Sequence, residues 1–175
     1  MKIEMETVNE LSTEDLDRAY RLYLGAVEKH DDTGFEIVPI EFFRNVSRNM
    51  PEEARFFLWK MDGRIVAFVF ALVSEGFLSD YYLGLDYSVA YQYHLYFLRF
   101  RDILNWCIAN GIKRYDVGVT GYEPKKRFGC SFVPSYIYMK HVNRFMNPLL
   151  GLAGVALRPE NHDKTLRDMK MRRRI

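Results

Sequence analysis

Cysteine is scarce in this chain of 175 residues. The two that are present, Cys107 and Cys130, are too few and too far apart for a disulfide framework or a zinc site. Cys107 lies in an apolar helical pattern, so we expect it to be a buried thiol in a reducing compartment. His30 and His141 have no companions at metal-ligand spacing, and the sequence therefore predicts no metal site.

Long apolar runs are missing as well. No stretch approaches the roughly 20 apolar residues that a membrane-spanning helix requires. Residues 1–6 include Lys2, Glu4 and Glu6 and lack the apolar centre of a signal peptide, so we expect a cytoplasmic protein. A large excess of charge is also absent, since a net charge of +2 provides no field over the whole surface that would attract nucleic acid.

Aromatic residues, by contrast, are abundant. They make up 15% of the chain, which suggests a thick core and some aromatic lining of a groove. A chain of this length buries roughly 70% of its unfolded surface when it folds as one domain. We place that domain at residues 1–145 and assign residues 146–175 to a C-terminal apolar segment and a basic tail.

The first elements are predicted by the spacing of apolar residues. Alternation over residues 2–8 indicates a half-exposed strand. Helical spacing then indicates two helices, one over residues 12–30 with Ser12 as its N-cap and one over residues 39–49 that begins at Pro39.

The middle of the chain changes to strand periodicity. Asp62-Gly63 favours a two-residue turn, so residues 55–61 and 64–74 form a predicted hairpin. Its second arm is apolar on both faces and is expected at the centre of a sheet. The later elements are a strand, a helix, a strand, a short helix, a strand and an apolar helix or docking segment, over residues 77–87, 95–109, 114–119, 125–128, 132–142 and 147–157.

This order of elements predicts a mixed α/β fold of the α+β kind. Its central sheet is mostly antiparallel, and its helices cover both faces. The helix over residues 95–109 is a crossover connection, which makes Tyr81–Tyr87 and Tyr115–Val119 parallel neighbours.

The segment Asp116–Gly129 concentrates the candidate chemistry. An apolar strand ends there in a turn framed by glycines, and a run of charged or phenolic side chains follows. Folds of this class commonly place catalytic side chains where a strand leaves the core. A solvated connection between two elements has the same composition and is the alternative.

Three kinds of side chain in this segment have candidate roles. Glu123 is a candidate general base for an attacking amine, or it caps the short helix that follows it. Asp116 lies on a strand expected to be buried, so its carboxylate needs a partner, either in a structural pair or in catalysis. Lys125 and Lys126 hold a phosphate or carboxylate, or form a solvated helix face.

Several strings in the second half of the chain resemble one family. They are His94–Phe97, Ile103–Arg114, Gly118–Gly129, and Lys125–Cys130 followed by Val133–Lys140. Together with the order of elements, they resemble the GNAT acyltransferase superfamily. The nearest resemblance is to the GNAT-like domain of Fem-type peptidyl transferases and related peptidoglycan-biosynthesis proteins.

The resemblance implies transfer of an acyl group from an acyl-CoA-type thioester, acetyl-CoA or another acyl-CoA, to a primary amine on a small molecule or peptide. In this fold the two parallel strands splay apart and the donor enters between them. Backbone amides of Leu85, Asp86 and Tyr87 would then bind the donor and stabilise an oxyanion. The donor's phosphates would lie at the start of the helix over residues 95–109, beside His94.

The sequence departs from the family in two places. Residues 88–94, before that helix, contain no glycine, whereas members that use acetyl-CoA have a Gly-rich turn there. Many members also use a tyrosine as general acid four residues before the closing glycine. That position is Lys125 in this chain, and Tyr122 lies one turn earlier as the candidate phenol.

Other functions remain open at this stage. The missing Gly-rich turn and the basic tail, Lys164–Ile175, favour aminoacyl transfer from tRNA as an alternative. The tail also suits anionic lipid, or it is a disordered solubilising end. Fem-type proteins pair two such domains, so a lone domain is a non-catalytic binding module, a homodimer, or part of a longer chain.

Overall fold

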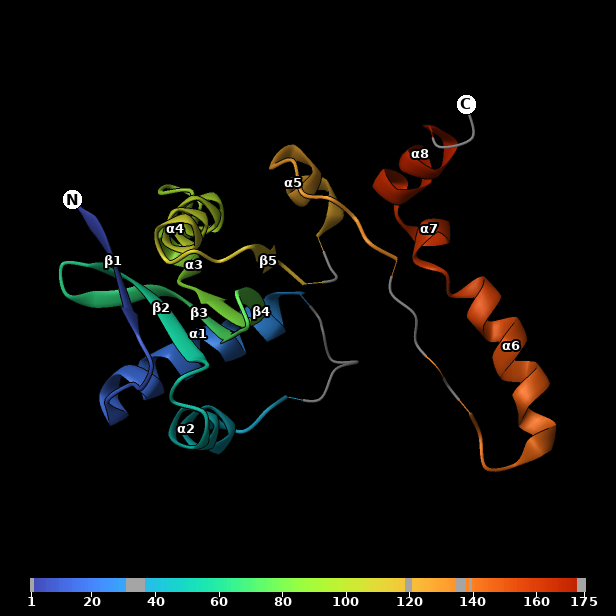
Figure 1. Ribbon diagram of the computed structural model, residues 1–175, viewed down its shortest axis with the longest axis horizontal. Coiled ribbons are helices and arrows are strands. Elements are labelled where there is room, and N and C mark those ends of the chain that lie inside the picture. The colour runs from blue at the N-terminus through green and yellow to red at the C-terminus, as the bar shows by residue number, and fades with distance from the viewer. Residues whose placement is uncertain (1, 31–36, 119–120, 135–137, 139, 173–175) are drawn as a thin grey trace. The chain divides into compact units, whose positions relative to one another are not determined.

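The computed structural model describes residues 2–30, 37–118, 121–134, 138 and 140–172 (Figure 1). Contacts divide the chain into two compact units, Met1–Gly118 and Val119–Ile175. The first unit contains the sheet, and the second contains short helices.

Five strands form one sheet in the first unit, and they follow one another across the sheet in sequence order. The first four strands pair antiparallel, and the fifth is parallel to the fourth. The predicted mixed, mostly antiparallel sheet with one parallel pair is therefore confirmed. The strands are β1 Ile3–Val8, β2 Ala54–Met61, β3 Arg64–Ser74, β4 Phe77–Leu85 and β5 Arg114–Asp116.

The hairpin of β2 and β3 has the turn that its sequence predicts. Asp62 and Gly63 both have positive φ, 49° and 79°, as the twist of a two-residue hairpin turn requires. β3 follows as the central strand, and its residues from Ile65 to Ala71 are all buried. Residues apolar on both faces fit this position because helices cover both sides of the sheet.

Two helices cover each face of the sheet (Figure 1). α1, Thr13–His30, and α2, Ile40–Asn49, pack on one face, where Phe43 is almost fully buried. α3, Tyr87–Ala90, and α4, Leu95–Ala109, pack on the other. The cap predicted for α1 is confirmed, since the Asp15 amide donates to Ser12 Oγ at 3.1 Å.

α1 crosses β4 in direct backbone contact at Gly84. A Cβ atom at this position would lie 2.5 Å from the carbonyl carbon of Leu22 and 2.6 Å from the amide nitrogen of Tyr23. Both of these atoms belong to the backbone of α1, so they cannot move aside as a side chain would. Gly84 therefore sets how closely α1 lies against the end of β4.

We expect Gly84→Ala to destabilise the protein by about 1–3 kcal/mol, because the added methyl group overpacks the contact between α1 and β4. Urea denaturation measures the change. Gly25→Ala is the matched control, since Gly25 lies in α1 with open space around its Cβ position. Gly25→Ala should leave the free energy of unfolding unchanged or raise it by up to about 1 kcal/mol. Equal effects of the two variants would contradict a close crossing at Gly84.

The second unit contains short helices joined by non-helical segments. α5, Tyr122–Arg127, begins earlier than the predicted short helix, and Gly129 follows it with a φ of 76°. Residues 164–172, for which a disordered end was one of the expectations, are helical. The remaining elements are the 3₁₀ helix η1 Arg144–Met146 and the helices α6 Asn147–Ala156, α7 Pro159–His162 and α8 Lys164–Arg172.

The strand predicted over residues 132–142 is wrong where the structure describes it. Residues 132–134, 138 and 140–142 adopt no strand, and residues 135–137 and 139 lie outside the described residues. The alternation of apolar residues was there, but a strand also needs a neighbour to complete its ladder. The end of the segment instead forms a side-chain-bonded turn, in which the His141 amide donates to Asn147 Oδ1 and the Asn143 amide to His141 Nδ1.

Candidate active site

β4 and β5 pair over only three residues and then part. The paired positions are Phe77 with Arg114, Leu78 with Tyr115 and Ser79 with Asp116. The parallel neighbours predicted at Tyr81–Tyr87 and Tyr115–Val119 are therefore displaced toward the start of β4 where the structure describes them, and Val119 lies outside the described residues. Beyond Ser79, no strand among the described residues covers this edge of β4.

A β-bulge in β4 marks the point of separation. Asp80 lies opposite Ala71 of β3 and Tyr82 lies opposite Phe70, so Tyr81 between them has no opposite residue. An extra residue of this kind bends its strand and increases its twist. The bulge explains the displaced pairing because it follows Ser79, the last residue that pairs with β5.

A buried charge cluster holds the elements together at this point. Asp80 Oδ2 accepts from Arg99 Nη1 of α4 at 2.9 Å and from the Tyr115 hydroxyl of β5 at 2.8 Å. Only 2% of Arg99 is exposed, and its guanidinium lies 4.2 Å from the ring centroid of Phe100. The cluster therefore joins β4, α4 and β5 where the sheet opens.

Burial is the main cause that raises the pKa of Tyr115 far above its ordinary value, and the charge of Asp80 adds to it. Tyr115 therefore stays protonated at physiological pH and keeps donating to Asp80. This cluster was not predicted from the sequence, although a signal was present. Arg99 lies four residues from both Leu95 and Ile103, within the inward stripe of α4, where a charge needs a buried partner.

Asp80→Ala should destabilise the fold by about 3–5 kcal/mol, since it leaves the Arg99 charge buried without its carboxylate. Tyr115→Phe removes one hydrogen bond to the same oxygen and should cost about 1 kcal/mol. Chemical denaturation of both variants measures the difference. A loss below about 1 kcal/mol for Asp80→Ala would show that the cluster does not hold the opening of the sheet.

The end of β4 directs two backbone amides toward the open edge. The Asp86 amide donates to the Val66 carbonyl of β3 at 2.7 Å. Amides alternate in direction along a strand, so those of Leu83 and Leu85 point away from β3, toward the side that β5 has left. Of the three amides predicted to bind a donor, the structure places that of Leu85 at this edge and turns that of Asp86 toward β3.

The Asp86 side chain anchors the start of α3. It accepts from Arg18 Nη2 of α1 at 2.6 Å and from the Ser88 amide at 3.2 Å, which caps the helix. Burial alone would raise the pKa of Asp86, but the hydrogen bonds from Ser88 and Arg18 outweigh it and hold the pKa below its ordinary value. Asp86 is therefore an ionised link between α1 and α3.

The turn between α3 and α4 uses many of its amides internally. The Val89 and Ala90 amides donate to the Asp86 carbonyl, the Tyr93 amide to Val89, and the His94 amide to Tyr91. His94 itself is exposed, has a left-handed backbone with a φ of 50°, and precedes α4 without a side-chain cap. An anion predicted at this end would therefore meet the first turn of α4 and the His94 ring, rather than the amides of the turn.

Lys29, near the end of α1, reaches over two tyrosine rings. Its Nζ lies 4.4 Å from the ring centroid of Tyr87 and 5.1 Å from that of Tyr91. Burial raises the pKa of Tyr87, and the neighbouring Tyr91 adds to this effect. Two phenol faces beside the end of β4 therefore already hold one alkylammonium group.

The predicted residues that follow β4 are distributed over both units. Asp116, at the end of β5, is exposed rather than buried as predicted, and its Oδ1 accepts from the Gly118 amide at 2.9 Å. Tyr122, Glu123, Lys125 and Lys126 all lie in α5 of the second unit. Only 4% of Lys125 is exposed, whereas Lys126 lies on the surface.

Glu123 is ion-paired within α5. Its Oε1 lies 2.6 Å from Arg127 Nη2, and 55% of its side chain is exposed. Glu123 also lines a polar depression between α5 and α8, together with Lys126, Arg127, Lys164, Thr165 and Asp168. The carboxylate is therefore accessible and has one cationic partner.

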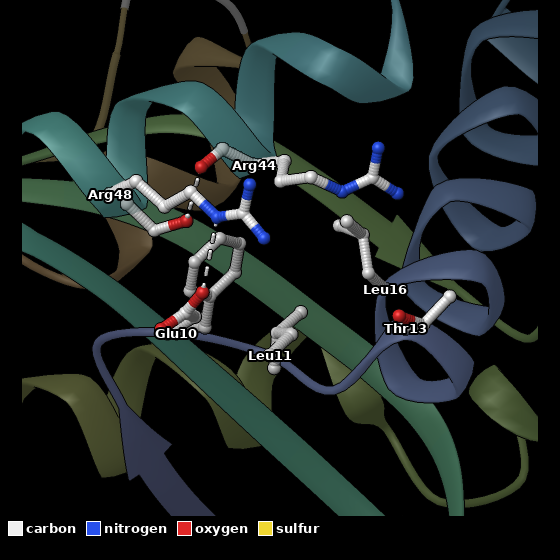
Figure 2. A pocket seen from close by; sticks show the side chains of 8 residues that line it. Glu10, Leu11, Thr13, Leu16, Arg44 and Arg48 are labelled. Atoms are coloured by element: carbon white, nitrogen blue, oxygen red, sulfur yellow. Dashed lines mark hydrogen bonds and ion pairs between the residues drawn. The ribbon is translucent and has the colours of Figure 1, made fainter.

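A separate small cavity lies between the start of α1 and the end of α2 (Figure 2). Its volume is about 30 Å³, which is room for a water molecule rather than a substrate. Arg48 Nε and Glu10 Oε1 meet beside it at 3.6 Å. Among the described residues, no three His, Cys, Asp or Glu side chains are grouped as metal ligands would be.

A mixed sheet whose parallel strands separate, with helices on both faces, is the architecture that the resemblance to the GNAT superfamily implies. The family model of the acetyltransferase (GNAT) domain matches residues 3–127. The chain therefore belongs to the GNAT acetyltransferase family, a family of enzymes. A comparison with curated proteins found no match.

Solved structures show the same fold. An aminoglycoside acetyltransferase from an uncultured soil metagenomic sample, solved with sisomicin, is 15% identical, with a TM-score of 0.56 over 79% of this chain and 97% of that one. A possible acetyltransferase from Clostridium difficile 630 has 15% identity and a TM-score of 0.58, over 81% and 99%. The aminoglycoside N-acetyltransferase AAC(6')-Iy, solved with a CoA bisubstrate analogue, has 10% identity and a TM-score of 0.56, over 81% and 99%. The expected GNAT fold is confirmed, and the nearer kinship to Fem-type proteins stays a prediction.

Proposed function

We propose that this protein transfers an acyl group from an acyl-CoA thioester to a primary amine. The observation that carries the proposal is the open edge of β4, where the amides of Leu83 and Leu85 face the side that β5 has left. One structural neighbour, the aminoglycoside N-acetyltransferase AAC(6')-Iy, has been solved both with CoA and with a CoA-containing bisubstrate analogue, which supports a thioester donor for this fold.

In this proposal the Leu85 amide binds the thioester carbonyl oxygen, and the Leu83 amide, about 6.8 Å away along the strand, meets another part of the donor. The amine nitrogen attacks the carbonyl carbon, the carbonyl oxygen gains negative charge, and the Leu85 N–H stabilises that charge in place of water. The C–S bond then breaks, and the thiolate leaves and takes up a proton. Leu85 is almost fully buried, so its amide lies in an environment where such a hydrogen bond is strong.

The acceptor in this proposal is a cation before it reacts. Tyr87 and Tyr91 hold the Lys29 ammonium at the end of β4, and the ammonium of a small molecule or peptide would bind the same faces by displacing Lys29. The soil aminoglycoside acetyltransferase was solved with an amine-bearing ligand, sisomicin, which agrees with an acceptor of this kind. A base must remove a proton before the amine attacks, and Glu123 of α5 is our candidate, with Tyr122 and Asp116 as further candidates for proton transfer.

Acetyl-CoA and free CoA should each raise the melting temperature of the protein. A ligand at 100 times its Kd stabilises the folded state by about 2.7 kcal/mol, which a thermal-shift assay resolves. His94→Ala should weaken the response if His94 meets the donor's phosphates, whereas His162→Ala in α7 should leave it unchanged. No shift at millimolar acetyl-CoA, CoA or longer acyl-CoA would contradict the thioester donor.

Glu123→Gln should bind donor normally and lose turnover by about 10²–10⁴-fold if Glu123 is the general base. Steady-state acetylation of a panel of primary amines measures turnover. Arg127→Gln is the matched variant, because it breaks the same ion pair and keeps the carboxylate. Equal turnover in the two variants would show that Glu123 acts only through its ion pair with Arg127 and is not the general base.

Aminoacyl transfer from tRNA is the second candidate function. The observation that favours it is the turn between α3 and α4, whose amides bond to the chain's own carbonyls instead of remaining open for a pyrophosphate. Saturable binding of aminoacyl-tRNA, together with no thermal response to CoA, would support this candidate over the first.

A further inference from the structure

α6 is apolar on every side and lies exposed. No charged residue occurs between Arg144 and Arg158, and Leu149, Leu152 and Val155 are all more than half exposed. A surface helix of a globular protein normally has an apolar stripe on one side and polar residues on the other. α6 lacks that division, so packing one side against the protein would still leave apolar side chains in water.

α6 is too short to cross a bilayer. Its 10 residues extend about 15 Å, half of the roughly 30 Å of a hydrocarbon core. Among the described residues, no helix combines the length and apolar character that a membrane span requires. A short helix of this composition can instead lie flat at the boundary between head groups and acyl chains.

Positive charge is concentrated in the C-terminal part of the chain, from residue 140 onward. Residues 140–175 contain nine Lys and Arg against three Asp and Glu, whereas residues 1–139 contain sixteen against twenty. Basic side chains flank α6 at Arg144 and Arg158, and Lys164 and Arg167 follow in α8. A positive segment around an apolar helix complements a surface that is anionic outside and apolar beneath.

We propose that residues 144–172 bind an anionic lipid surface. α6 enters the interface, and the basic residues that flank it meet the lipid head groups. A second copy of the chain is disfavoured as the occupant, because association through this region would bring two positive segments together. Nucleic acid would match the charge, but it offers no apolar layer for α6. The inference does not depend on acyl transfer.

Vesicle flotation with the full chain tests the proposal. The protein should float with vesicles of phosphatidylcholine and phosphatidylglycerol and remain in solution with phosphatidylcholine alone. Raising the salt from about 0.1 M to about 1 M should weaken binding, since it shortens the Debye length from about 10 Å to about 3 Å. Absence of binding to the anionic vesicles, or equal binding to both kinds, would overturn the proposal.

Two matched substitutions locate the contact. Leu152 in α6 and Ile108 in α4 are equally exposed, at 70% and 71%. Leu152→Glu should lower vesicle affinity by at least about tenfold, because it puts a carboxylate into the interface, whereas Ile108→Glu should leave the affinity unchanged. Circular dichroism checks that both variants fold. Equal affinities in the two variants would overturn the placement of α6.

A tryptophan at each position reports its surroundings directly. Leu152→Trp should shift its emission to shorter wavelength on anionic vesicles, while Ile108→Trp should not, against the same background from Trp59 and Trp106.

Light scattering tests whether a second copy of the chain, rather than a lipid surface, covers α6. A dimer that Leu152→Glu dissociates, with no vesicle binding by either form, would assign α6 to a second copy and overturn the lipid surface.

Discussion

The opening of the sheet depends on the buried pair of Asp80 and Arg99. Ladder hydrogen bonds between β4 and β5 end at Ser79, so the backbone alone does not hold the two strands beyond that point. Asp80 is the next residue, and it joins β4 to α4 through Arg99 and to β5 through Tyr115. Buried pairs often add little net stability, but removal of one partner is costly, so the pair favours one arrangement over others.

A second constraint connects the other face of the sheet to the same edge. α1 lies against β4 at Gly84, with backbone atoms where a side chain would be. Arg18 of α1 bonds Asp86, the residue after β4, and Lys29 of the same helix lies over Tyr87. α1 therefore positions both the start of α3 and the aromatic pair that we propose for the acceptor. A change at Gly84 would move these groups together.

Local signals in the sequence were enough for most of the fold. Asp62-Gly63, Ser12 and the apolar run of β3 each act over a few neighbouring residues, and all three formed as predicted. The bulge at Tyr81 was not predictable in this way, because it depends on the register between two strands. The same holds for Asp80 and Arg99, which are 19 residues apart and meet only once α4 is in place.

The candidate site was predicted less completely than the fold. Leu85 lies at the edge that β5 has left, and its role in donor binding stays a prediction. The direction of the Asp86 amide follows from its bond to the Val66 carbonyl, which periodicity does not reveal. The strand expected over residues 132–142 had a clear local signal but did not form where the structure describes it. Its alternation of apolar residues was clear, but alternation describes only one strand, whereas a sheet needs a partner strand as well.

The family resemblance implies that both the carbonyl and the pyrophosphate of the donor bind to backbone amides. The two places differ in this chain. In the proposed function, the carbonyl end of the donor lies at the open amides of β4, whereas the turn from Asp86 to His94 satisfies most of its own amides. Contacts to the carbonyl oxygen strengthen as charge develops on it, so they lower the barrier to reaction. Contacts to a distant pyrophosphate are equal before and during the reaction, so they affect donor affinity more than turnover. A chain built in this way can therefore bind its donor weakly and still catalyse transfer.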